Sequence, residues 1–561
     1  MPGLLQLFRT VSHLKLRQMA YQLIRRLGSP TKVSPIIGIV ALRQRVALSL
    51  PVMRRMHGEE NAFTFQNVTR CFDPARFNWA APDMDKLWRY NLHYFDYLQE
   101  KGRPWESKSF LVESWIQSNP QGVPDAWEPF PVSLRIVNWI KLFLSPEAAG
   151  KLEERWLKSL YVQAQWLEKN IEYHLLANHF FKNGKALVFA GCYFDGVDAW
   201  RWLKKGLTII GEEVDEQILE DGGHFERSPM YHSMILEDCL DIDNIMTGMP
   251  SPEVQMLRQR LRQKIGTMIV FLDGMCHPDG DISLFNDAAI GIEAKAATLF
   301  DYFERLTGEK AKKITGGACV FCKSGYYILS PRPGDRLIID CGPVGPDYQP
   351  GHAHCDTLSF ELSLLGRRVI VDSGCRQYVD GDIRQYNRGN AGHNTVSIDG
   401  ENQSEVWGAH RVARRAYPLD AALEATPDGS LRFSGAHDGY CRLPGSPVHR
   451  RTVTWSGNIL LIEDRITGRG CHDIESRLHI CPDLAVALTA CRAVIQDGPE
   501  LLATVSLAGE GRIERESGWY CPEFGIQRSC VVLTTTQRNV SLPFYGGWKI
   551  TTGTSACASS F

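Results

Sequence analysis

The sequence lacks any run of about 18 apolar residues, so we expect no transmembrane helix in this 561-residue chain. It also lacks an excess of charge of either sign, since 62 Lys and Arg residues face 64 Asp and Glu residues for a net charge of −2. This balance argues against a protein that binds nucleic acid or a membrane surface, although local basic patches could still bind an acidic polymer.

Paired cysteine motifs are scarce, although the chain has 16 cysteines. Cys319 and Cys322 form the only CxxC, and no second pair stands at zinc-finger spacing, which excludes an ordinary structural finger. The N-terminal segment has basic residues threaded through it and lacks the continuous apolar stretch of a secretory signal. We therefore expect reduced thiols and a cytoplasmic protein, with the periplasm or cell envelope as the alternative.

The length of the chain and a change in its apolar period predict three parts. Residues 1–75 form a basic, partly helical extension, residues 76–315 have a helical period, and residues 316–561 carry short β-rich runs. We expect the second part to be a helical bundle or toroid and the third to be an antiparallel β-sandwich. The fold class is thus multidomain α + β, with a cleft between the two large domains as the expected ligand site.

Serine–proline pairs mark three expected helix starts, because serine caps a helix and proline fits its first turn. These pairs begin at Ser145, Ser228 and Ser251. The pair at Ser228 places Tyr231 and His232 in the first turn of its helix.

The strands that we expect in the third part are short and separated by Gly, Pro, Asp and Asn. They cover residues 336–341, 357–365, 368–372, 395–398, 451–455, 459–462, 502–507 and 530–535. Strict alternation over residues 357–365 predicts a strand with one buried face.

A cluster of histidines precedes and follows that strand. His352 and His354 are separated by one residue, Asp372 lies in a Val-Asp-Ser-Gly segment, and His393 lies in Gly-His-Asn-Thr-Val. If the strand extends back to the histidines, His352 and His354 point to the same side of the sheet. Two imidazoles and a carboxylate suit a zinc-type ion and leave a fourth position for water or substrate.

The helical part has two polar segments of its own. Asn178 and His179 lie in NHFFKNGKAL, and Tyr231 and His232 end the segment DGGHFERSPMYH. Taken alone, Asn178 could be a helix cap and Tyr231 a core aromatic residue. These residues therefore indicate a functional site only when they are considered together.

That set, together with GHAHCDTLSFEL, VDSG and GHNTV, resembles the heparinase II/III-like polysaccharide lyases, a family with alginate and oligoalginate lyase relatives. The resemblance covers roughly residues 80–520 in the right order. It implies an incomplete (α/α) toroid followed by an antiparallel β-sandwich, and an enzyme that cleaves a uronic-acid-containing polysaccharide by β-elimination.

The resemblance also implies roles for individual residues. Asn178, with His179 beside it, would neutralise the uronate carboxylate, and Tyr231 would act at the glycosidic oxygen. His352 would face the substrate from the sandwich. The implied ligands of one structural zinc ion are His354, Asp372 and His393.

Four further residues are weaker candidates. Tyr378 is the expected second catalytic tyrosine, and Tyr386 competes with it for that position. Arg388 could hold a uronate carboxylate with the two-pronged geometry of arginine, and His232 is a further substrate-binding candidate.

The sequence leaves the substrate, and the number of chains in the assembly, undetermined. The basic N-terminal segment resembles that of lyase-like proteins associated with bacterial exopolysaccharide production. Two rival functions are a non-catalytic polysaccharide-binding or assembly factor with the same fold, and a zinc-dependent hydrolase.

Overall fold

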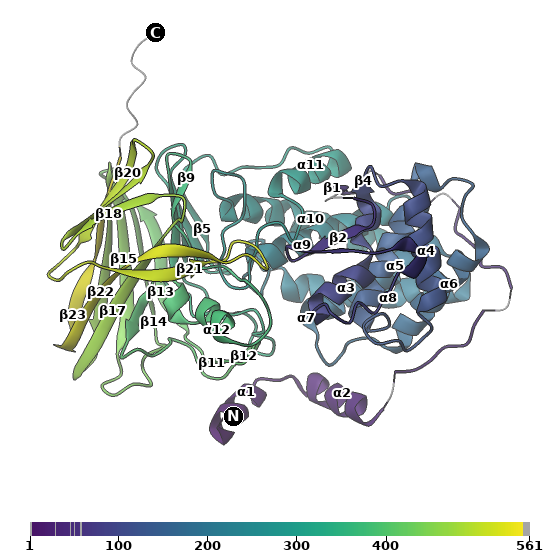
Figure 1. Cartoon of the computed structure of the whole chain (residues 1–561), viewed down its shortest axis with the longest axis horizontal. Coiled ribbons are helices and arrows are strands. Elements are labelled where there is room, and N and C mark those ends of the chain that lie inside the picture. The colour runs from purple at the N-terminus through teal and green to yellow at the C-terminus, as the bar shows by residue number, and fades with distance from the viewer. Residues whose placement is uncertain are drawn as a thin grey trace, which may run out of the picture.

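A helical half and a strand-rich half follow one another in the computed structural model, which describes residues 3–28, 30–36, 38–44, 46–49, 51–55 and 59–553 (Figure 1). The predicted fold class, a helical domain followed by antiparallel sheets, is confirmed. Within these residues no helix has the length and apolar character needed to cross a membrane. The helices are α1 (Leu4–Val11), α2 (Leu16–Leu27), α3 (Lys86–Tyr94), α4 (Trp105–Ser118), α5 (Pro129–Phe143), α6 (Glu154–Lys169), α7 (Ala177–Tyr193), α8 (Val197–Gln217), α9 (Pro229–Ile245), α10 (Pro252–Met275), α11 (Ala296–Thr307) and α12 (Asp382–Arg388).

Two of the three expected helix starts are found where serine precedes proline. Helix α9 begins at Pro229, with the Ser228 hydroxyl accepting a hydrogen bond from the Tyr231 backbone N–H, and α10 begins at Pro252. The expectation at Ser145 is wrong. Only a single 3-10 turn, Pro146–Ala148, follows it, because the chain turns at Gly150 with φ of +72° and the helix starts at Glu154.

Short strands accompany the helical half. β1 (Arg54–Arg55) pairs in parallel with β4 (Glu100–Lys101), and β2 (Ala62–Phe65) forms a hairpin with β3 (Val68–Cys71).

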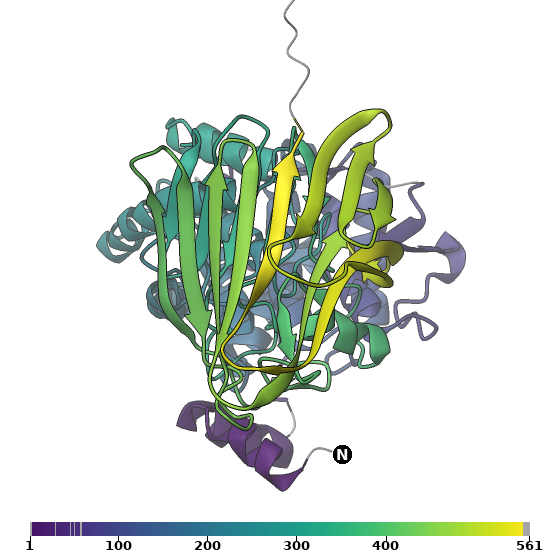
Figure 2. The same ribbon diagram turned by 90° about the vertical axis from the view of Figure 1, so that its left-hand side faces the viewer.

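The second half is a sandwich of two large antiparallel sheets, seen from its outer face in Figure 2. The sheet next to the helices has the order β21-β22-β17-β9-β8-β7-β6-β5, with β10 paired to β17. Its strands are β5 (Gly317–Phe321), β6 (Tyr326–Ser330), β7 (Arg336–Asp340), β8 (Phe360–Leu364), β9 (Arg367–Ile370), β10 (Val396–Ile398), β17 (Cys471–Ile480), β21 (Glu514–Tyr520) and β22 (Arg528–Ser541).

The outer sheet has the order β13-β14-β15-β16-β23-β20-β19-β18. Its strands are β13 (Pro418–Ala425), β14 (Leu431–His437), β15 (Val448–Ser456), β16 (Ile459–Thr467), β18 (Ala485–Thr489), β19 (Arg492–Asp497), β20 (Glu500–Leu507) and β23 (Phe544–Thr552). A small ribbon of β11 (Val406–Trp407) and β12 (Arg411–Val412) completes the fold.

Strand β8 is buried on both faces, which corrects the expectation of one buried face. Phe360, Leu362 and Leu364 lie in the core between the two sheets. Glu361 and Ser363 point the other way, where His277 and the backbone of Leu284 from the helical half contact them. The inner sheet is therefore covered by the helical half, and polar side chains on that side are satisfied across the junction.

One loop of the helical half is joined to the segment before β8 by hydrogen bonds that include three donated by backbone N–H groups. The Asn286 N–H donates to the Asp356 carboxylate at 2.9 Å, and the Asn286 side-chain oxygen accepts from the His354 N–H at 3.0 Å. The Asp287 N–H donates to the His352 carbonyl at 3.0 Å. This junction carries the histidines singled out in the sequence, and strand β8 itself begins only at Phe360.

Candidate active site

A cavity of about 310 Å³ lies between the helices and the sandwich. Its wall includes all five residues expected to be catalytic, which are Asn178, His179, Tyr231, His352 and Tyr378. These residues are spread over 200 positions of the sequence, from 178 to 378, and only the packing of the two halves brings them together.

Two tyrosine hydroxyls meet in this cavity. The hydroxyl of Tyr231, in the first turn of α9, lies 2.9 Å from that of Tyr378, which comes from the loop after β9. Burial raises the pKa of both phenols well above the ordinary value. Both side chains are thus protonated near neutral pH and able to donate a proton.

His352 lies against Tyr231, with the two ring centroids 4.0 Å apart. Its Nδ1 atom is 3.0 Å from the Asp287 carboxylate, which fixes the ring, and its Nε2 atom is 3.5 Å from the Glu226 carboxylate. Burial raises the pKa of Glu226 above its ordinary value. An imidazole held in this way by a carboxylate on one nitrogen is suited to proton transfer at the other.

Asn178 and His179 occupy the first turn of α7. The two residues before them, Leu176 and Ala177, have φ of +63° and +50°, a conformation that side chains rarely adopt. His179 is held by Glu172, with Nδ1 3.2 Å from a carboxylate oxygen. This strained turn directs an amide and an imidazole into the cavity, where both could hydrogen-bond an anionic group.

Three of the weaker candidates do not line the cavity. Arg388 is buried and donates to backbone carbonyls, including that of Gly408 at 2.9 Å. His232 is buried with Nε2 3.0 Å from the Met268 carbonyl. Tyr386 lies instead beside His479, 3.0 Å away. The geometry places Tyr378 rather than Tyr386 in the cavity, and it gives Arg388 and His232 structural roles in place of substrate contacts.

The sequence reasoning missed the group that holds the histidines. Asp287 is fully buried and contacts both His352 and His354, and Arg384 of α12 forms a paired ion bridge with it. His410, from the loop between β11 and β12, also lines the cavity, and burial lowers its pKa to about 4. Asp287 and Arg384 stand in no periodic pattern, so their partnership could be seen only in three dimensions.

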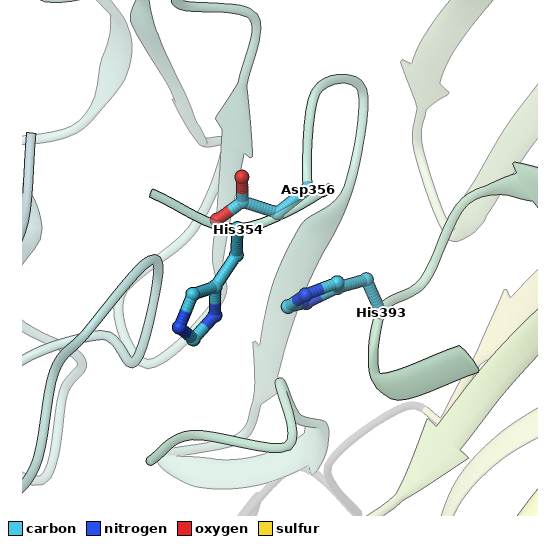
Figure 3. Close-up of side chains that lie close together, drawn as sticks. All are labelled: His354, Asp356 and His393. Atoms are coloured by element: carbon cyan, nitrogen blue, oxygen red, sulfur yellow. The ribbon is translucent and has the colours of Figure 1, made fainter. Parts of the chain in front are cut away.

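A second cluster, His354, Asp356 and His393, is buried on the sandwich side of the junction with the helical half (Figure 3). One atom of each side chain, a ring nitrogen or a carboxylate oxygen, lies within 4.8 Å of the other two. The metal ligands expected from the sequence include Asp372 where this cluster has Asp356. The Asp372 carboxylate lies 2.7 Å from Nδ1 of His393.

The residues of this cluster fit a metal ion. Nδ1 of His354 and Nε2 of His393 are buried and have no hydrogen-bond partner among the described residues. The other nitrogen of each ring lies against a carboxylate, Asp287 for His354 and Asp372 for His393, as is usual for histidines that bind metals. Burial lowers the pKa of His354 to about 4, which keeps that imidazole in the neutral form that metals bind.

Comparison with known proteins gives two family matches that together span most of the chain. Residues 41–307 match the heparinase II/III N-terminus, and residues 315–557 match the heparinase II/III-like C-terminal domain. The chain is 23% identical over 389 residues to a heparin-sulfate lyase of Bacteroides stercoris, covering 58% of this chain and 56% of that protein. It is 24% identical over 267 residues to the FtsZ-localized protein C of Caulobacter vibrioides, covering 46% and 43%.

A solved structure of heparinase III superposes with a TM-score of 0.67 at 17% identity, covering 98% of this chain and 94% of that one. At this identity the likeness concerns the fold. The chain spans about half the length of the curated relatives that it matches.

Proposed function

We propose that this chain, which belongs to the heparinase II/III-like family, is a polysaccharide lyase that cleaves a uronic-acid-containing polysaccharide by β-elimination. The observation that carries the proposal is the meeting of Asn178, Tyr231 and His352 in one cavity. A scaffold protein has no need of an amide, a phenol and an imidazole around a single space.

The amide of Asn178 would act on the substrate carboxylate. The proton at C5 of a uronate is only weakly acidic while the neighbouring carboxylate keeps its charge. Hydrogen bonds from Asn178 and His179 to that carboxylate stabilise the charge that develops when the proton leaves.

The proton transfers then fall to His352 and Tyr231. His352 would take the C5 proton, because its ring is held by Asp287. Tyr231 would donate a proton to the departing O4 oxygen, since burial keeps its phenol protonated. The Tyr378 hydroxyl, 2.9 Å away, would hydrogen-bond the resulting Tyr231 phenolate, and the C5 proton held by His352 would return to that phenolate when the product leaves.

A zinc ion bound by His354, Asp356 and His393 would have a structural role. It would hold the segment before β8 and the segment before β10 together behind His352. His354 and His393 are completely buried and neither lines the cavity. This burial argues against the rival hydrolase, in which a metal-bound water must reach the substrate.

The charges around the cavity favour a sparsely charged polymer. Among the described residues that line this cavity there is no arginine. The lining has three lysines, Lys141, Lys182 and Lys185, and four Asp or Glu side chains. These lysines are already paired with Asp238 and Asp241 at 2.6–2.8 Å. A heavily sulfated chain would find few uncommitted cations, so we propose a uronate polymer with little or no sulfate, such as a bacterial exopolysaccharide.

Product analysis tests this proposal. The purified protein is incubated with unsulfated uronate polymers and with heparin, and new ultraviolet absorbance is recorded. Elimination leaves an absorbing C4–C5 double bond, hydrolysis shortens the polymer without one, and a binding or assembly factor leaves the polymer intact. Faster cleavage of heparin than of every unsulfated polymer would contradict the proposed substrate class.

A further inference from the structure

The N-terminal segment concentrates positive charge that the whole-chain balance conceals. The first 58 residues contain ten Lys and Arg residues and no Asp or Glu, whereas the complete chain has a net charge of −2. The balanced charge of the whole chain therefore does not exclude binding of this segment to a membrane surface. It includes helices α1 and α2, which lie outside both domains at one edge of the molecule in two perpendicular views (Figures 1 and 2).

Helix α1 lies with its polar side toward the rest of the protein. Arg9 lies 3.5 Å from Glu405, and the Thr10 hydroxyl accepts a hydrogen bond from the Trp407 indole at 3.2 Å. None of its residues is buried, and Leu4 and Phe8 are 87% and 71% exposed. Amphipathic helices at a protein surface ordinarily bury their apolar side, so this orientation is the reverse of the usual one.

Helix α2 has the same reversed orientation. Gln18, its single buried residue, donates to the Leu175 carbonyl at 3.3 Å. The Arg17 guanidinium lies 4.4 Å from the centre of the Tyr173 ring. The exposed side chains of this helix include its large apolar ones, which are Leu16, Met19, Leu23, Ile24 and Leu27.

We propose that the outward apolar side of α1 and α2 binds the surface of an anionic phospholipid membrane. Exposed apolar side chains of this kind suit the boundary between lipid headgroups and acyl chains. Arg9 and Lys15 are paired with Glu405 and Glu216, but the first 58 residues contain no Asp or Glu of their own, so their net positive charge attracts anionic headgroups. A second copy of the chain would instead bring two strongly basic segments together.

Vesicle sedimentation tests this proposal with the full chain. Vesicles of phosphatidylcholine alone are compared with vesicles that contain phosphatidylglycerol, at low and at physiological salt. Wild-type protein is expected to bind the phosphatidylglycerol vesicles, more weakly at higher salt, and to bind phosphatidylcholine poorly. The Phe8→Asp/Leu27→Asp variant should bind at least about tenfold more weakly, because it places two charges in the apolar strip.

The matched control replaces two equally exposed apolar residues elsewhere. Val197 and Met256, on α8 and α10, are 83% and 68% exposed, against 81% for Leu27 and 71% for Phe8. The Val197→Asp/Met256→Asp variant carries the same added charge and should bind vesicles like the wild type. Equal loss in both variants, or no preference for phosphatidylglycerol, would overturn the proposal. A wild-type dimer that Phe8→Asp/Leu27→Asp converts to monomer would assign the surface to a second copy instead, and binding of the acidic polymer without vesicle binding would assign it to the substrate.

Discussion

The hydroxyls of Tyr231 and Tyr378 link the two halves inside the cavity, 2.9 Å apart. One comes from the first turn of a helix and the other from a loop of the sandwich. The His352 ring lies against that of Tyr231, with the two centroids 4.0 Å apart, so the imidazole and the phenol occupy neighbouring positions in the cavity wall. Burial keeps both phenols protonated near neutral pH.

Tyr231→Phe removes one hydroxyl and almost no volume, so the fold should persist. If the phenol protonates the leaving oxygen, kcat should fall by roughly 10²–10⁴-fold while KM changes little. Steady-state kinetics on a cleaved polymer measure this. Tyr386→Phe is the matched control, since Tyr386 lies outside the cavity beside His479 and should leave kcat near the wild-type value. Wild-type turnover in Tyr231→Phe would move the proton donor to Tyr378.

The carboxylates around His393 give a second prediction at this scale. If Asp356 binds the metal ion directly, Asp356→Asn should abolish near-stoichiometric zinc binding. Asp372→Asn should lower the affinity by only about 10–100-fold, because Asp372 orients His393 from behind. Elemental analysis after zinc repletion and competition with a chelator would measure both. The reverse order of effects would restore Asp372 as the ligand, and a stable wild type that binds no zinc would exclude the site.

At the scale of elements, strands β15 and β16 carry a buried ion pair that contacts the segments next to the candidate metal site. Arg451 bonds Asp464 through two nitrogens at 2.8 and 2.9 Å. The same guanidinium donates to the carbonyls of Leu358 and Asn394 at 2.7 and 2.6 Å. One arginine of the outer sheet therefore fixes both the segment before β8 and the residue after His393.

Asp464→Asn should destabilise the protein by about 3–5 kcal/mol at neutral pH, because it leaves Arg451 buried without its counter-charge. Burial would raise the pKa of Asp464, but the Arg451 guanidinium holds it well below its ordinary value. The stabilisation is therefore complete above about pH 5 and is lost as pH falls through the native pKa. Urea unfolding at several pH values should show a steeper acid loss for the wild type than for Asp464→Asn. Parallel pH curves would contradict the assignment.

The sequence predicted elements well where local signals agreed with packing. Serine and proline mark the starts of α9 and α10, because the Ser228 hydroxyl caps α9 and proline fits the first turn of both helices. Several expected strands, such as residues 336–341, contain a strand of the structure, here β7. The alternation over residues 357–365 misled, because polar residues such as Glu361 are buried against the helical half. Alternation with a period of two distinguishes the two faces of a strand, but it does not show whether another domain covers the polar face.

At the scale of the whole molecule, the candidate site exists only because the two halves are packed together. Motifs indicated Asn178, Tyr231, His352 and Tyr378, and all four line one cavity. They did not indicate Asp287, because its partners lie 65–97 residues away in the sequence. Likewise the residue type of Arg388 and its position just before His393 suggest contact with a uronate carboxylate, whereas its guanidinium donates to backbone carbonyls. Motifs thus supply candidate residues, and the packing determines which of them face the substrate.

Asp287 is the contact through which the two halves depend on each other most directly. It comes from the helical half, is fully buried, and contacts His352, His354 and Arg384 of the sandwich half. Asp287→Asn leaves the Arg384 guanidinium buried without its partner, so we expect a loss of about 3–5 kcal/mol in the free energy of unfolding. The exposed pair of Asp420 and Arg450 is the matched control, and Asp420→Asn should cost at most about 1 kcal/mol.

The same substitution should also impair catalysis in the protein that remains folded. His352 would lose the carboxylate that holds its Nδ1 atom, so kcat should fall under conditions where Asp287→Asn is still fully native by circular dichroism. Urea unfolding and steady-state kinetics on one preparation separate the two effects. A variant as stable as Asp420→Asn, with unchanged kcat, would show that the junction is held elsewhere and that His352 needs no carboxylate behind it.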